Sequence, residues 1–225
     1  MMHTFTRFIT AAFICTLAVS RSGYAAEAAA ATGDASAVET TPSPARLLGV
    51  MPNYMTVDTG HVTVQTTHDA YKAASLNTFD PFVYPIVGVQ TMFGSGSGSN
   101  YATRYSRVFA DNAIGNFMTS AVVPSLTGED SRYYRRGSGG VFSRLAYAAS
   151  RSVVTRTRSG GTAFNIAEIG GNAAAAGLSN LYYSPSDRTV GATASRWATQ
   201  IAWDTLANEL KEFWPDINAR LRPKR

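Results

Sequence analysis

Residues 164–183 read FNIAEIGGNAAAAGLSNLYY, a stretch long enough for a helix but built largely from Gly, Ala, Ser and Asn. Each glycine in a helix interior costs roughly 1 kcal/mol relative to Ala, so Gly170, Gly171 and Gly177 do not suit a helix that faces water. Small residues do suit a helix whose backbone lies against a second backbone. We therefore predict a helix over 163–183 that packs through small-residue seams, meaning helix faces made of Gly, Ala and Ser.

Four further segments have the features of helices, and they are 81–93, 101–123, 141–157 and 187–214. Asp80 suits the cap of the first, and Pro124 and Gly128 mark the end of the second. Pro215 breaks or kinks the last. Short connections between sequential helices favour antiparallel neighbours. The sequence therefore predicts an all-α domain, a bundle of four to five helices with small-residue packing seams.

Residues 1–25 have the features of a secretory signal. Arg7 gives a basic start, residues 8–19 are apolar, and small residues at 23–28 suit a signal peptidase. The apolar run is too short to span a bilayer comfortably, and an uncleaved anchor is the alternative. We expect an exported protein, located in the periplasm or associated with the outer membrane.

Composition divides the remaining chain into four parts. They are a disordered linker (26–46), an irregular lead-in (47–78), a helical bundle domain (79–217) and a basic tail (218–225). The linker lacks large apolar residues and cannot offset its ordering entropy. In the lead-in we expect one or two helical turns at 69–75 and, at most, one short strand pair.

Cysteine and overall charge exclude several classes of chemistry. Cys15 is the one cysteine and lies within the signal, so the mature chain has no disulfide and no thiolate nucleophile. The chain has 20 Lys and Arg against 15 Asp and Glu, and removal of residues 1–25 takes away Arg7 and Arg21, leaving 18 against 15. This mild excess, without a recognition motif, does not indicate nucleic-acid binding.

Arginine is concentrated between Asp130 and Glu168, where the sequence has no acidic residue. Predicted anion-binding residues are Arg132, Arg135, Arg136, Arg144, Arg151 and Arg158, and Arg156 lies in the same stretch. Three of them recur every seven residues, which would place them near one helical face. Arginine suits bidentate contact with phosphate and carboxylate, so an anionic lipid or envelope polymer is the expected partner.

The alternative for these arginines is structural. Acidic residues are spread over helices that lack arginine runs, and pairing across the bundle would satisfy both charges. The acids concerned are Asp111, Glu168, Asp204 and Glu212. The two interpretations make opposite predictions about whether the arginines face outward.

No sequence motif specifies a reaction. The chain has no HExxH, GxSxG or ExxH pattern, and 94–99 (GSGSGS) lacks the ending of a phosphate loop. No cofactor or metal is predicted, since Asp58, His61, His68 and Asp69 form a weak ligand set. Asp111 and Glu168 are weak catalytic candidates, provided that their helices face each other.

Carboxamide side chains recur at spacings of three and four residues, so each group shares a helical face. Examples are Asn112 with Asn116, Asn165 with Glu168 and Asn172, and Asp204 with Asn208. Among small residues such groups usually form hydrogen bonds between helices and fix their register. Contact with a substrate is the alternative.

Hydropathy does not favour ordinary transmembrane helices, because no run after the signal approaches about 20 predominantly apolar residues. Association with a membrane surface through Tyr and Trp is an alternative to burial of these rings in a core. Self-association into a homo-oligomer is left open.

The segments DSRYYRRGSGG (130–140), RLAYAASRSVVTRT (144–157), GGNAAAAGLSNLYY (170–183) and KEFWPDI (211–217) resemble an uncharacterised family of exported proteins from acidobacteria-like soil bacteria. The resemblance covers roughly half of the chain, from Phe109 to Ile217. It implies a recurring envelope-type module and no particular activity, so it supplies no catalytic residues.

Two functions follow from these observations. The first is an exported, non-enzymatic envelope-associated structural or binding protein that contacts an anionic partner through arginine and tyrosine. The second is a hydrolase or transferase acting on an envelope glycan or lipid, with Asp111 or Glu168 as acid or base. Clustered carboxylates in a pocket would favour the enzyme, and an outward row of Arg144, Arg151 and Arg158 would favour anion binding.

Overall fold

The computed structural model describes residues 46–47, 51–58, 64–93 and 99–221, which are mostly helical. The helices are α3 (Thr67–Thr78), α4 (Val83–Phe93), α5 (Tyr101–Phe117), η1 (Met118–Val122), α6 (Val123–Thr127), α7 (Val141–Ser150), η2 (Ala167–Gly171), α8 (Asn172–Ser179), η3 (Pro185–Asp187) and α9 (Val190–Leu221). The strands are β1 (Arg46–Leu47), β2 (Met51–Pro52), β3 (Thr56–Val57), β4 (Glu129–Asp130), β5 (Tyr133–Tyr134), β6 (Val154–Thr157) and β7 (Thr162–Phe164). The signal over 1–25, nearly all of the linker over 26–46, His61 and most of the GSGSGS run lie outside the described residues.

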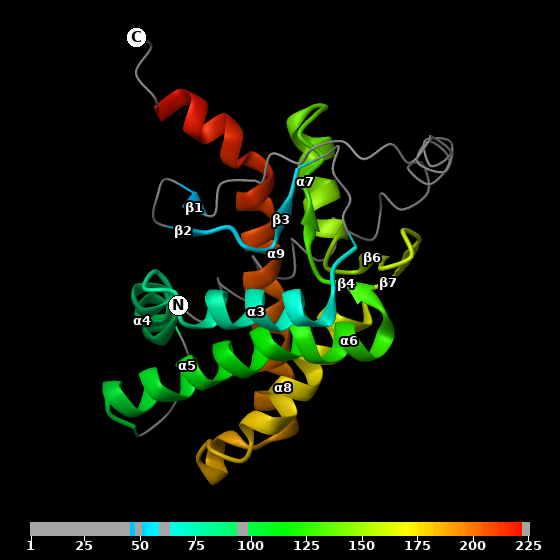
Figure 1. Ribbon diagram of the computed structural model, residues 1–225. Helices are drawn as coiled ribbons and strands as arrows, with labels where there is room; N and C mark the ends of the chain where they lie inside the picture. The colour runs from blue at the N-terminus through cyan, green and yellow to red at the C-terminus, as the bar shows by residue number, and fades with distance from the viewer. Residues whose placement is uncertain (1–45, 48–50, 59–63, 94–98, 222–225) are drawn as a thin grey trace.

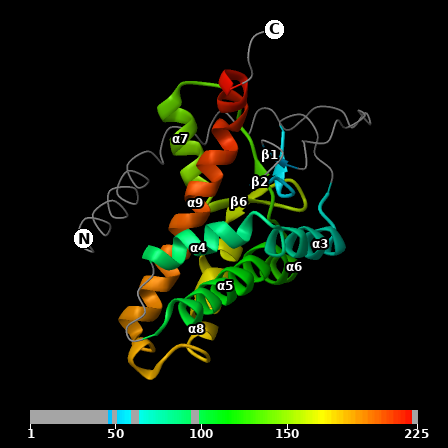
Figure 2. The ribbon, with the colours of Figure 1, turned by 90° about the vertical axis from the view of Figure 1, so that its left-hand side faces the viewer.

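Two long helical segments organise the domain (Figures 1 and 2). α5, η1 and α6 follow one another without a break from residue 101 to residue 127. α3 and α4 pack on α5, α7 packs on α9, and α8 contacts both α5 and α9. The expected helices therefore exist, but Figure 1 shows α3 and α5 crossing α9 instead of lying along it.

The ends of the α5 to α6 segment follow from its sequence. Asn100 accepts a hydrogen bond from the Thr103 N–H at 2.9 Å and so caps the start of α5. Gly128 ends α6 with a φ of 72°, a left-handed conformation that glycine adopts without strain. The end predicted at Gly128 is confirmed, whereas Pro124 lies inside the helical segment, which continues past the predicted bound at residue 123.

The helices predicted over 141–157 and 163–183 are wrong in part. α7 ends at Ser150, and a hairpin of β6 and β7 follows, with Val154 paired to Phe164 and Arg156 paired to Thr162. The β-branched residues of 153–157 favour a strand, and Gly160 turns the chain with a φ of 87°. β4 joins this hairpin as a third strand, so the described chain is not purely α-helical.

Small residues pack closely where α3 meets η1, with Ala70, Ala74 and Ala121 fully buried, and again at Gly171. A Cβ on Gly171 would lie 3.3 Å from the backbone C and O of Met118, so only glycine allows η2 to approach η1 this closely. Gly177 and Gly191 instead face open space, and Gly170 is near only Ile166 of its own segment. The prediction is confirmed for Gly171 and wrong for Gly177.

The lead-in predicted to be irregular contains α3, a helix of 12 residues. Its start is a capping box, in which Thr66 and Asp69 each satisfy the other's backbone N–H. Asn116 of α5 donates from its amide nitrogen to the Ala74 carbonyl at 2.8 Å and to the Thr78 hydroxyl at 2.6 Å. This carboxamide therefore fixes the position of one helix on another, as its spacing predicts.

α9 continues through Pro215 to Leu221, so the first residues of the predicted basic tail are helical. In Figure 1 the last turns of α9 are inclined to the rest of the helix. Within the described part of the chain, no helix combines the length and apolar character needed to cross a bilayer.

Candidate functional site

A cavity of about 1010 Å³ lies among α5, η2, α8, α9 and the strands β4 to β6. Carboxylates from four of these elements line it, together with a lysine and several arginines. The acidic members are Asp111, Glu129, Glu168 and Asp204. A large concave site with converging polar groups is the default position for a ligand.

The centre of the site is the pair Glu168 and Asp204, which we call the carboxyl pair. Glu168 belongs to η2 and Asp204 to α9, and the Asn172 amide nitrogen donates to both of them at 3.1 Å. The two carboxyl groups also share a hydrogen bond. Two segments that are distant in the sequence thus bring two acids together at the cavity wall.

The start of η2 is held by buried Glu129 of β4. Its carboxylate accepts hydrogen bonds from the N–H groups of Ile166 at 2.8 Å and Ala167 at 2.9 Å. Asn165 accepts a further bond from the Glu168 N–H at 2.8 Å. A π-helical segment such as η2 is uncommon and occurs frequently at functional sites.

Burial raises the pKa of Glu168 well above its usual range, and the charge of Asp204 and the hydrogen bond to it add to this effect. Burial also raises the pKa of Asp204, although hydrogen bonds from Asn172 and Glu168 act in the opposite direction. Both carboxyls therefore hold a proton more readily than a free carboxyl does. Carboxyls whose environments separate their proton affinities can act as an acid and a base.

Lys211 is the cationic neighbour of the carboxyl pair and comes from the same helix as Asp204. Burial lowers the pKa of its ammonium, and the charges of Asp204 and Glu168 oppose that shift. Asp204 and Lys211 are seven residues apart in α9, so both lie on the helix face that lines the cavity.

Asp111 lies elsewhere in the cavity wall and does not form the predicted pair with Glu168. Its two carboxylate oxygens accept hydrogen bonds from the hydroxyls of Tyr182 and Tyr183, each at 2.6 Å. Burial raises the pKa of Asp111, and these two hydrogen bonds act against it. Arg196 and Arg107 lie over the Tyr183 ring, with guanidinium carbons at 4.3 Å and 5.4 Å from its centroid.

Glu212 is a structural carboxylate with 0% exposure. It accepts hydrogen bonds from the Tyr133 hydroxyl, the Arg144 guanidinium, and the N–H groups of Arg136 and Gly137, at 2.8–2.9 Å. Burial alone would raise its pKa, but these donors hold it below the usual value. Arg144 also pairs with Asp216.

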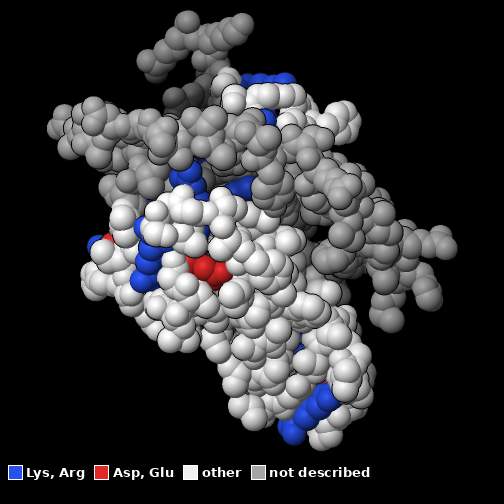
Figure 3. All heavy atoms as spheres, turned by 90° about the vertical axis from the view of Figure 1, so that its right-hand side faces the viewer, with Lys and Arg blue, Asp and Glu red and all other residues white. Residues whose placement is uncertain are grey.

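The arginines predicted to bind anions do not form one outward row. Arg144 is 7% exposed and paired as above, while Arg158 follows a strand and donates to Thr67 at 3.1 Å. The prediction that Arg144, Arg151 and Arg158 share a helical face is wrong, because α7 ends at Ser150. On the face shown in Figure 3, Lys and Arg atoms lie in separate groups.

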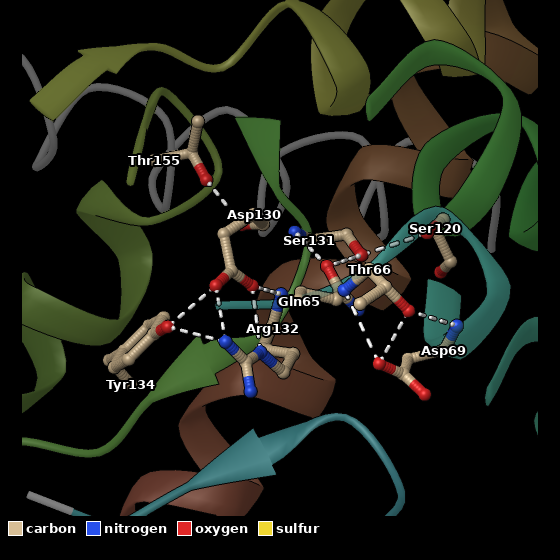
Figure 4. Close-up of polar contacts among 9 residues, drawn as sticks. All are labelled: Gln65, Thr66, Asp69, Ser120, Asp130, Ser131, Arg132, Tyr134 and Thr155. Atoms are coloured by element: carbon tan, nitrogen blue, oxygen red, sulfur yellow. Dashed lines mark hydrogen bonds and ion pairs between the residues drawn. The ribbon is translucent and has the colours of Figure 1, made fainter. Parts of the chain in front are cut away.

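Other predicted arginines contact acids or rings. Arg132 donates to Asp130 at 2.6 and 2.9 Å, and the Tyr134 hydroxyl donates to the same carboxylate at 2.6 Å (Figure 4). Arg135 pairs with Asp58. Arg136 and Arg151 lie over the Tyr147 ring, at 5.8 and 4.5 Å. Of the four acids expected to pair with arginines, Glu212 does so with Arg144, while Arg132, Arg135 and Arg144 also pair with Asp130, Asp58 and Asp216. Anion binding by the remaining residues stays a prediction.

The sequence did not indicate the partner of Glu168. Asp204 was predicted to fix helix register with Asn208 or to pair with an arginine, and Lys211 was not among the predicted site residues. The spacing of Asp204 and Lys211 on one helix was the available signal. The pairing of Asp204 with Glu168 depends on how α9 lies beside η2, which no local pattern specifies.

Searches of protein-family models, of curated proteins and of solved structures each found no match to this chain. The roles of its residues therefore rest on the geometry described above.

Proposed function

We propose that the chain is a hydrolase or transferase that uses the carboxyl pair for general acid–base catalysis in the cavity. The observation that carries this proposal is the hydrogen-bonded contact of Glu168 and Asp204, bridged by Asn172, in the cavity wall. Titratable groups that are buried together beside a cleft occur preferentially at active sites.

The reaction that suits this pair is attack of water or an alcohol on an acyl carbon. Asp204 takes a proton from the attacking O–H group while the oxygen forms its bond to the acyl carbon. Glu168 donates its proton to the leaving oxygen or nitrogen as the acyl bond breaks. The pair then carries one proton as before, transferred from Asp204 to Glu168, and the electrons balance without a redox partner.

The contact between the carboxyl groups favours esters or amides over glycosides. Glycosidases hold their two carboxyls about 5 Å or more apart, on either side of the scissile bond. A hydrogen-bonded pair leaves no room for a sugar ring between its members. Among the envelope substrates considered, an acylated lipid therefore fits better than a glycan.

Lys211 has a supporting role in this proposal. Its positive charge lowers the pKa of both carboxyls and so favours one ionised member of the pair. Because burial disfavours an isolated charge, the lysine and the ionised Asp204 stabilise each other. An exported location, based on residues 1–25, belongs to the same proposal.

The test uses the purified full chain and a panel of p-nitrophenyl esters and p-nitroanilides of different acyl length. We expect turnover by the wild type and a loss of at least about 100-fold in Glu168→Gln and in Asp204→Asn. Glu209→Gln is the matched control, because Glu209 lies on the same helix but does not line the cavity. Circular dichroism verifies that each variant is folded.

Two results would contradict the proposal. One is turnover that is unaffected by both substitutions, and the other is absence of turnover across the panel. Binding of acyl compounds in the cavity without turnover would instead support the non-enzymatic binding protein predicted first from the sequence.

A further inference from the structure

Arg151 and Arg156 differ from the other arginines that line the cavity. Arg104, Arg107, Arg132 and Arg196 donate to protein oxygens, among them those of Thr91, Ser184, Asp130 and Asn180. Among the residues that the structure describes, the guanidinium groups of Arg151 and Arg156 make no hydrogen bond or ion pair. The Nε of Arg151 is buried and still has no partner.

Aromatic rings hold both guanidinium groups in place. Arg156 lies over Tyr134 at 4.7 Å from the ring centroid, and Arg151 lies over Tyr147 at 4.5 Å. The two rings are linked, because the Tyr147 hydroxyl donates to the Tyr134 carbonyl at 2.7 Å. Stacking positions an arginine without using its N–H donors, so these donors stay available for a ligand.

Asp130, which lies opposite Arg156 in the β4–β6 ladder, forms no ion pair with it. Asp130 is already engaged by Arg132 and by the Tyr134 hydroxyl (Figure 4). Tyr134 itself is neutral at physiological pH, since burial and its bond to Asp130 raise its pKa to about 12. Arg151 and Arg156 therefore line the cavity without an ion pair to any acid of the described chain.

We propose that Arg151 and Arg156 form a subsite for an oxyanion, a phosphate or carboxylate group, of the molecule that enters the cavity. Arginine N–H groups match such oxygens in bidentate geometry. The inference rests on the proposed function in that it assigns an anionic group to the acyl substrate handled by the carboxyl pair. It adds Arg156, which was not among the predicted anion-binding residues, to the anion site, and it places the role of Arg151 inside the cavity.

The first experiment titrates the full chain with inorganic phosphate and, separately, acetate by isothermal titration calorimetry at low salt. We expect binding of at least one of the two anions and at least a tenfold weaker affinity in Arg151→Gln and Arg156→Gln. Arg220→Gln is the control, because it removes the same charge at an exposed position in the last turns of α9. Unchanged affinity in both cavity variants, or no binding of either anion by the wild type, overturns the proposal.

A second arm identifies the source of the oxyanion. Vesicles of phosphatidylglycerol that sediment with the wild type, and are displaced by inorganic phosphate, indicate a lipid headgroup. Binding of phosphate without binding of these vesicles indicates a free small molecule. Phosphatidylcholine vesicles are the reference in both cases.

Further variants separate this inference from the proposed function. Glu168→Gln keeps anion affinity at the wild-type value if the subsite is correct, whatever happens to turnover. Loss of anion affinity in that variant overturns the subsite as placed here. Where a glutamine variant does not fold, Arg156→Lys or Arg151→Lys retains the charge and should lose the bidentate contact, with weaker binding of phosphate.

Discussion

Glu212 of α9 and Glu168 of η2 are both glutamates shielded from solvent at the carboxyl group, yet their surroundings are opposite. Glu212 receives four donors, including a guanidinium, and its pKa is lowered. Glu168 receives the Asn172 amide and lies beside a second carboxyl, and its pKa is raised. A carboxylate whose hydrogen-bonding capacity is filled stabilises a fold, whereas one that shares a proton beside a cavity is suited to chemistry.

The largest effect should come from Glu212→Gln. The substitution leaves the buried Arg144 guanidinium without its buried charged partner, and breaking such a pair costs about 3–5 kcal/mol. Urea denaturation at pH 7 measures the loss. Asp216→Asn removes the other partner of Arg144, which is 49% exposed, and should cost no more than about 1 kcal/mol. Equal losses in the two variants would contradict the distinction drawn between these carboxylates.

Gly171→Leu should destabilise the protein by about 1–3 kcal/mol through overpacking. A side chain at this position meets the backbone of Met118, which cannot move without displacing η1. Because η2 carries Glu168, we expect the same variant to disturb the carboxyl pair. Thermal denaturation gives the stability, and a wild-type melting temperature would show that the approach is not tight.

The pH dependence of stability should have opposite signs at the two glutamates. Because the pKa of Glu168 is raised in the folded protein, this residue contributes to the free energy of unfolding. The contribution is complete below the pKa of an unfolded glutamate, about 4.3, and is lost as pH rises through the pKa of the folded state. The pKa of Glu212 is lowered in the folded protein, so its contribution to the free energy of unfolding is present above the unfolded pKa of about 4.3. That contribution is lost as pH falls through the pKa of the folded state.

Glu168→Gln should therefore become more stable relative to the wild type as pH increases from 4 to 8. For Glu212→Gln, the deficit relative to the wild type should shrink on acidification. Denaturation curves collected over this range test both statements, and parallel pH profiles for wild type and Glu168→Gln would refute the first.

The smallest expected effect is a gain from Gly177→Ala. Gly177 lies within α8, and nothing stands within 4 Å of the added methyl group. Alanine should stabilise the helix by roughly 0.5–1 kcal/mol. A loss of stability in thermal denaturation would mean that Gly177 is packed as tightly as Gly171.

Local signals in the sequence were sufficient for several elements. Gly128 marks the end of α6, Asp80 accepts the Phe82 N–H at 2.9 Å before α4, and Gly171 marks the closest backbone approach. Each of these depends on a residue type that a particular backbone conformation or distance requires. The mostly helical class of the domain followed from the same kind of signal.

The features that were missed depend on tertiary context. The spacing of Arg144, Arg151 and Arg158 suggested a helical face, but the β-branched residues between them pair as a strand with β4 and β7. Glu168 was named as a candidate, yet its partner is Asp204 and not Asp111. Which carboxylate meets which is determined by how η2, α5 and α9 cross, and a single sequence does not encode that in any short pattern.

Glu129 connects the two parts of the cavity wall to which the proposals assign roles. Its backbone belongs to the three-stranded sheet that carries Arg156, while its carboxylate is bound to the first N–H groups of the segment that carries Glu168. The Glu129 side chain therefore connects strand β4 to the π-helical segment η2. One buried carboxylate thus fixes how the strand beside Arg156 and the segment with Glu168 lie relative to each other, and its loss should loosen both sides of the cavity together.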